Sequence, residues 1–142
     1  MRRVFLDTNI LMDAVEYRTH GAEANTLLDM SRCSLIKTCA TTMSFATMSY
    51  LLRHHTKEEL HLIFANLVDA LDIVPVNTNA FNLAMEYGPV KDFEDLLQYQ
   101  SALAASCDVI ISNNISDFAE FSQLPLMTAE EFLLQFEDSP RL

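Results

Sequence analysis

The chain has 142 residues, half of them apolar and a fifth charged, which is the composition of one folded domain with a real core. No apolar run approaches the about 20 residues that span a bilayer, and the amino terminus does not resemble a signal peptide, so we expect a cytoplasmic protein with no membrane contact. The net charge of −11 excludes broad electrostatic attraction to nucleic acid or anionic membrane and favours a basic protein partner. A divalent metal that supplies positive charge locally would still permit a nucleic-acid enzyme.

The predicted elements alternate between strands and helices along the whole chain. We expect strands at residues 4–6, 34–41, 71–76, 108–112 and 124–127. Pro75 indicates that the third strand lies near a sheet edge or ends there. Apolar residues at helical spacing, with capping boxes at 56–59 and 128–131, predict helices at 43–53, 56–68, 79–87, 92–106, around 117–118 and at 130–136. Residues 11–28 form either two short helices or one interrupted helical hairpin.

This alternation predicts an α/β fold: a mainly parallel sheet with right-handed crossovers, covered by helices on both faces. With no repeat, linker or low-complexity tract, we expect a single domain over residues 1–137 and a tail over 138–142. Apolar stripes on the helices of 11–28 and 45–68 exceed what a thin sheet needs, which suggests a homodimer.

Several common kinds of site are excluded by motif. Neither Gly21 nor Gly88 belongs to a phosphate-binding glycine loop, and no G-x-S-x-G elbow is present. The three cysteines have no C-x-x-C spacing and the four histidines form no H-x-x-x-H pair, so neither a disulfide framework nor a structural zinc site is supported. What remains is a set of carboxylates at strand ends and helix starts.

These carboxylates are Asp7 after the first strand, the cluster Asp92, Glu94 and Asp95 at the start of a helix, and Asp117 beyond the fourth strand. If the fourth strand pairs beside the first, they converge at one edge of the sheet, where α/β proteins bind ligands. Clustered carboxylates repel one another unless a cation lies between them, and hard oxygen ligands select Mg²⁺ or Mn²⁺. Convergence would therefore suit metal-assisted phosphodiester hydrolysis.

Each acid also has a purely structural explanation. Asp7 with Thr8 and Asn9, and equally Asp92, are ordinary helix N-caps. Glu94 and Asp95 suit the positive end of a helix dipole, and Asp117 could be a solvated surface acid. Phosphatase or phosphoacceptor chemistry at Asp7 fits poorly, because Asn9 stands where a haloacid-dehalogenase-like site needs a second Asp.

Three segments in order, VFLDTN at 4–9, KDFEDLLQY at 91–99 and IISNNISDF at 110–118, resemble a PIN domain. The resemblance covers nearly the whole chain and extends to a bacterial branch through Pro125 and the TAEEF segment at 128–132. It implies a five-stranded sheet in the order 3-2-1-4-5 and a Mg²⁺- or Mn²⁺-dependent ribonuclease. It also implies an RNA substrate and, as in VapBC-type pairs, a toxin with an antitoxin protein as partner.

The resemblance assigns the first and third family acids to Asp7 and Asp95, with Asn9 ordering the site. The second acid position is Thr47 and the fourth is Asn114, although Asp117 one turn later could substitute. We therefore expect Asp7, Asp95 and Asp117 to be the catalytic and metal-binding residues. The supporting residues would be Thr8, Asn9, Thr47, Glu94 and Asn114. The two departures leave open a catalytically weakened or inactive module that binds protein or RNA.

Overall fold

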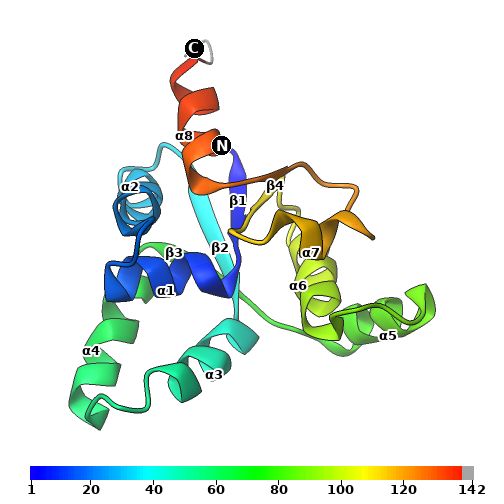
Figure 1. Ribbon diagram of the computed structural model, residues 1–142, viewed down its shortest axis with the longest axis horizontal. Helices are drawn as coiled ribbons and strands as arrows, with labels where there is room; N and C mark the ends of the chain where they lie inside the picture. Colours follow the sequence, from blue (N-terminus) through cyan, green and yellow to red (C-terminus); the bar gives the residue numbers. More distant parts are fainter. Residues whose placement is uncertain (139–142) are drawn as a thin grey trace.

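A computed structural model describes residues 1–138 and contains one five-stranded sheet in the order β3-β2-β1-β4-β5 (Figure 1). All four strand pairings are parallel. The strands are β1 (Arg3–Leu6), β2 (Lys37–Thr41), β3 (Leu71–Val74), β4 (Val109–Ile111) and β5 (Leu126–Met127). The predicted α/β class and strand order are confirmed, and β3, which precedes Pro75, is an edge strand as expected.

Helices occupy the segments between the strands. They are α1 (Thr8–Glu16), α2 (Gly21–Arg32), α3 (Thr42–Leu51), α4 (Lys57–Val68), α5 (Thr78–Tyr87), α6 (Phe93–Ala104), α7 (Ile115–Ala119) and α8 (Ala129–Asp138). Asp138 ends α8, so only 139–142 of the expected tail lie outside the described residues. Over residues 1–138, no helix is long and apolar enough to cross a membrane.

Residues 11–28 form two separate helices, which resolves the alternative left open above. Tyr17 ends α1 in the left-handed conformation at φ 50°, and its backbone N–H donates to the carbonyl of Asp13. Gly21 starts α2 against α1 so closely that a Cβ there would lie 2.8 Å from the same Asp13 oxygen. The turn between the helices therefore has a defined shape that depends on glycine.

The second strand is shorter than predicted at its beginning. Ser34 adopts a left-handed φ of 60°, and Leu35 donates its backbone N–H to the carbonyl of Met30 at 2.9 Å. These residues thus belong to the turn that ends α2, and pairing with β1 begins only at Lys37.

Two hydrophobic layers lie on opposite faces of the sheet. Val4 and Leu6 of β1 pack with α1, α2, α4 and α8, whereas Phe5 between them packs with α5, α6 and α7. This alternation is the two-residue period of a strand that is buried on both faces. In Figure 1 the helices of the first group lie on one side of β1 and β2, and those of the second group lie on the other.

The carboxyl ends of the strands meet at one edge of the sheet, where the strands are followed by polar residues. Asp7 follows β1, Thr41 ends β2 and Ser112 follows β4. Residues of α1 and α3 and of the start of α6 line one cavity at this edge, and Figure 1 shows how these helices are arranged around the sheet.

Candidate active site

Asp7 is held at the carboxyl edge by contacts from two neighbouring strands. Its backbone N–H donates to the carbonyl of Ile111 in β4 at 3.0 Å, which continues the β1–β4 ladder. One carboxylate oxygen accepts the backbone N–H of Thr8 at 2.8 Å, and the other accepts the hydroxyl of Ser112 at 2.8 Å. Asp7 is therefore both the N-cap of α1 and a side chain fixed against the end of β4.

Burial raises the pKa of Asp7, since the residue is only 7% exposed and its charged form is poorly solvated. The hydrogen bonds from Ser112 and Thr8 oppose this rise, and the nearby charges of Glu94 and Asp117 add to it. A carboxylate in these surroundings gains stability from a cation placed beside it.

The first turn of α6 brings three more carboxylates to the same cavity. Asp92 is the N-cap and accepts the backbone N–H of Asp95 at 3.2 Å, as the sequence predicts. Glu94 and Asp95 line the cavity as well. Burial, followed by the negative charges of Asp7, Asp92, Asp117 and Glu94, raises the pKa of Asp95 to about 7.

Thr47 of α3 faces this turn across the cavity. Its hydroxyl donates to the carboxylate of Glu94 at 3.4 Å, a long and partly exposed hydrogen bond. Residue 47, where the family resemblance leads one to expect an acid, is thus next to an acid from α6.

The segment after β4 supplies Asn114 and Asp117, and both line the cavity. The backbone N–H of Asn114 donates to the hydroxyl of Ser112 at 3.0 Å, which links it to the residue that holds Asp7. Asp117 lies in the first turn of α7. The predicted convergence of Asp7, Asp95 and Asp117 on one cavity is therefore observed, whereas their roles are not tested by this geometry.

Asn9 joins α1 to the corner after β4. Its side-chain oxygen accepts the backbone N–H of Asn113 at 3.3 Å, and the Asn113 amide donates to the buried carboxylate of Asp13 at 2.6 Å. Asn9 therefore helps to maintain the shape of the cavity, and it is also one of the residues that line it.

Beneath the cavity lies a buried polar network that sequence reasoning did not identify. Gln98 of α6, only 1% exposed, donates to the hydroxyls of Ser44 at 2.9 Å and Thr8 at 3.3 Å. The Gln98 side-chain oxygen accepts a hydrogen bond from the Thr41 hydroxyl at 2.6 Å. The hydroxyl oxygens of Thr8 and Ser44 are hydrogen-bonded to each other at 2.8 Å. The available signal was a glutamine one turn after the acids Glu94 and Asp95 on the same helix.

The cavity has an oxygen-rich lining that suits a hard divalent cation. It measures about 250 Å³, and its acids are Asp7, Asp92, Glu94, Asp95 and Asp117. Within residues 1–138, no three Asp, Glu, His or Cys side chains stand close enough to hold one ion together. Mg²⁺ commonly binds through only one or two carboxylates and keeps several waters, so the donor set fits this ion without such a cluster.

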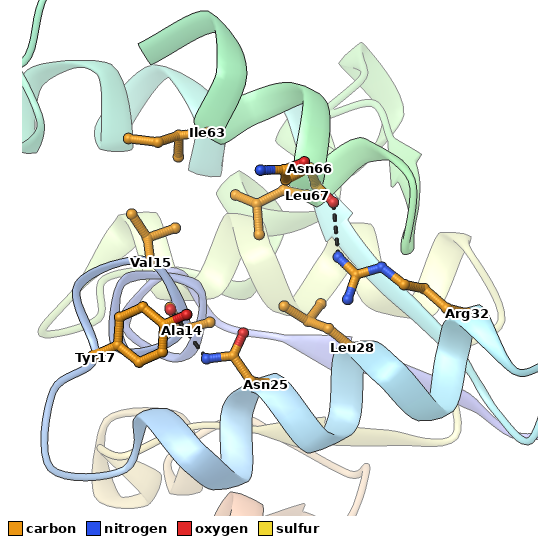
Figure 2. A pocket seen from close by; sticks show the side chains of 9 residues that line it. All are labelled: Ala14, Val15, Tyr17, Asn25, Leu28, Arg32, Ile63, Asn66 and Leu67. Carbon is orange, nitrogen blue, oxygen red and sulfur yellow. Dashed lines mark hydrogen bonds between the residues drawn. The ribbon is translucent and has the colours of Figure 1, made fainter. Parts of the chain in front are cut away.

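A second cavity lies between the α1–α2 pair and α4, on one side of the sheet (Figure 2). Val15, Leu28, Ile63 and Leu67 form its apolar part. Two hydrogen bonds cross its polar rim, from Asn25 to the carbonyl of Ala14 at 3.1 Å and from Arg32 to the carbonyl of Asn66 at 2.8 Å. No acid lines it, so it cannot hold a cation in the same way.

The fold, the strand order and the acidic cavity define a known class of protein. Residues 3–116 match the family model of the PIN domain, and the chain belongs to the PIN-domain family. The expected family resemblance is thereby confirmed.

The chain is similar to a VapC ribonuclease in sequence and to toxin–antitoxin complexes in fold. It is 26% identical over 138 residues to Ribonuclease VapC1 of Aquifex aeolicus, with 92% of each chain covered. The structure of VapBC2 from Rickettsia felis bound to a promoter DNA fragment superposes with a TM-score of 0.68 at 20% identity, covering 87% of this chain and 96% of that one. A toxin–antitoxin complex from Klebsiella pneumoniae gives a TM-score of 0.60 at 18% identity, covering 89% and 97%.

Proposed function

We propose that the protein is a Mg²⁺- or Mn²⁺-dependent ribonuclease that acts in the cytoplasm. The observation that carries this proposal is the buried Asp7 at the carboxyl edge, in a cavity that four further carboxylates line. Relatedness to a VapC ribonuclease supports the choice of RNA as substrate.

In this proposal Asp7 and Asp95 hold the ion and Asp117 completes its surroundings directly or through water. A bound Mg²⁺ or Mn²⁺ supplies activation of water and charge neutralisation at the phosphodiester. Ser112 and Thr8 keep the Asp7 carboxylate oriented by donating to its two oxygens. Asn9 and Asn114 maintain the shape of the corner after β4.

Glu94 and Thr47 form the opposite side of the proposed site. The Thr47 hydroxyl steadies the Glu94 carboxylate, and Glu94 provides negative charge near residue 47, which carries none. We therefore assign Glu94 the supporting role of compensating for the acid that position 47 lacks.

The test is cleavage of a panel of RNAs by the purified protein with Mn²⁺. Asp7→Asn removes the charge that faces the ion and should lower cleavage by about a hundredfold to a thousandfold, the size of effect seen when a group that stabilises a transition state is lost. The fold should be retained, because Asn is of similar size and also an N-cap residue.

Asp108→Asn is the matched control, because this carboxylate accepts the backbone N–H of Arg3 at the opposite end of the sheet, and the change should leave cleavage unchanged. Absence of cleavage by the wild type, or equal cleavage by Asp7→Asn, would contradict the proposal.

A non-catalytic module that binds protein or RNA is the second candidate, motivated by Thr47 and Asn114 at two positions where the family usually has acids. Calorimetric titration separates the two functions. Binding of Mn²⁺ by the wild type and its loss in Asp7→Asn supports the enzyme, whereas no binding near millimolar concentration supports the module.

We also propose that the chain is a toxin whose partner is an antitoxin protein, because it is similar in fold to a toxin–antitoxin complex. A basic segment would complement the charge of −11. We assign the docking of an apolar segment of the same partner to the cavity of Figure 2, where an apolar floor lies beside the exposed ring of Tyr17. Ile63→Asp should abolish co-purification with an antitoxin protein expressed together with this chain, whereas Leu62→Asp, on the exposed side of α4, should not.

The homodimer remains a proposal, but its supporting surface changes. Apolar residues of the two predicted stripes, such as Leu11, Leu27 and Met48, are buried in the core of the chain itself. Exposed apolar side chains instead gather on α5, at Phe81, Leu83, Met85 and Tyr87. Light scattering after size-exclusion chromatography measures the oligomeric state, and a monomer would contradict the dimer.

A further inference from the structure

One cation lines the acidic cavity. Among the lining side chains that the structure describes, Arg18 is the only Lys, Arg or His, and five carboxylates line the same cavity. A phosphodiester is itself an anion, so these carboxylates repel it wherever no cation intervenes. A bound metal offsets part of this repulsion, but an RNA strand presents further phosphates on either side of the bond that is cut.

The backbone around Arg18 is fixed in place by the turn between α1 and α2. The Arg18 N–H donates to the carbonyl of Asp13 at 3.2 Å, and the Arg18 carbonyl accepts the N–H of Gly21 at 2.7 Å. The backbone of Tyr17 is in the left-handed conformation, and Gly21 packs closely against the backbone of α1. The turn therefore has little freedom to place residue 18 elsewhere. A turn of defined shape thus positions Arg18 at the cavity.

The Arg18 side chain has only a weak engagement within the protein. One terminal nitrogen donates to the carboxylate of Glu16 at 2.8 Å, and the Arg18 side chain is 47% exposed. Exposed ion pairs of this kind contribute little, so little is lost when the guanidinium moves to another anion. Its planar fork of donors matches phosphate oxygens bidentately, which a carboxylate-lined cavity otherwise cannot offer.

We propose that Arg18 binds a non-bridging phosphate oxygen of the RNA next to the bond that is cleaved. This inference rests on the proposed ribonuclease function for its substrate, and it adds a substrate-binding residue that is not an acid.

The experiment measures binding and cleavage separately. A short fluorescent single-stranded RNA of mixed sequence is titrated with the protein in Ca²⁺, over a series of KCl concentrations, and cleavage is measured in Mn²⁺. Arg18→Gln should weaken binding about tenfold or more, the loss of one charge-assisted contact. The slope of log K against log salt should fall by about 0.7, the value for one phosphate contact on a single strand.

Two control variants separate this contact from other effects of charge. Arg2→Gln makes the same change of net charge at the opposite end of β1, where Arg2 lies over the Phe132 ring, and should keep the wild-type slope. Glu16→Gln removes only the protein's own partner of Arg18, and should leave RNA binding unchanged or tighter.

The outcomes distinguish this inference from the ribonuclease proposal. If the wild type cleaves RNA but Arg18→Gln keeps its affinity, slope and KM, Arg18 is only a surface partner of Glu16 and the inference is overturned while the enzyme stands. If the wild type binds RNA with an Arg18-dependent slope but does not cleave it, the phosphate contact of Arg18 stands while its position beside a cleaved bond falls with the enzyme. Equal weakening by Glu16→Gln and Arg18→Gln also overturns the inference, and a wild type that binds no RNA overturns both.

Discussion

The two sides of the acidic cavity are built differently. On the β1–β4 side, Asp7 is buried and both its carboxylate oxygens accept hydrogen bonds of 2.8 Å, from Thr8 and Ser112. On the α3–α6 side, Thr47 and Glu94 share one exposed hydrogen bond of 3.4 Å. One acid is therefore positioned before any ligand arrives, whereas the opposite acids can adjust to what binds.

Gln98 connects the two sides of the cavity through its buried hydrogen bonds. Its replacement should have the largest effect among the tests of this comparison. Gln98→Leu removes the acceptor of the buried Thr41 hydroxyl and the donor to Ser44 and Thr8, and should lower the free energy of unfolding by about 2–3 kcal/mol. Urea unfolding curves measure this loss. Gln100→Leu makes the same change two residues later on α6, at a less buried position, and should shift stability by no more than about 0.5 kcal/mol. If the two variants lose the same free energy of unfolding, the hydrogen bonds of Gln98 do not stabilise the contact between the two sides of the cavity.

The role of the α3–α6 side can be tested by placing an acid at position 47. Thr47→Glu should strengthen Mn²⁺ binding about tenfold, or about 1.4 kcal/mol, because a further carboxylate faces the ion. Isothermal titration calorimetry measures the change. Thr47→Gln is similar in size without the charge and should not strengthen binding. If both variants bind Mn²⁺ equally well, the α3–α6 side does not contact the ion.

The repulsion among the carboxylates on the α3–α6 side should also make the free energy of unfolding depend on pH. The pKa of Asp95 is raised to about 7 in the folded state from an ordinary value near 3.8, so the folded state binds more protons between these values. Stability without metal should therefore fall as the pH rises from about 4 to about 7, by about 1 kcal/mol after allowance for partial exposure of the side chain.

The contribution of Asp95 is isolated as the difference between wild type and Asp95→Asn in urea unfolding at each pH. The variant should be the more stable protein at pH 7 and lose that advantage toward pH 4. A difference that grows toward acid pH would contradict the repulsion described here.

The sequence was sufficient for the order of strands and for the acids that converge. Periodicity located β1 and the helices, and the family resemblance supplied the order 3-2-1-4-5, which placed the ends of β1 and β4 side by side. Strand ends were less accurate. Residues 34–36 look like strand, yet the turn that ends α2 competes for their backbone hydrogen bonds.

The polar network and the cationic residue were not predictable in the same way. Gln98 and Ser44 look like ordinary polar residues of helices until tertiary packing buries them together. Arg18 follows α1 in a polar turn, and no spacing rule indicates that Tyr17 and Gly21 direct it to the cavity. Thr47 could be placed at a family acid position, but its neighbour Glu94 comes from an element 47 residues away in sequence.

The turn between α1 and α2 has a thermodynamic consequence. Tyr17 lines the cavity of Figure 2 and Arg18, the next residue, lines the acidic cavity. Because the turn is constrained, only a ligand that distorts it at one cavity would change affinity at the other. By linkage, the two binding free energies would then alter by the same amount, whichever ligand arrives first. Two adjacent residues on a glycine-dependent turn thus give the domain a short route for coupling one surface to another.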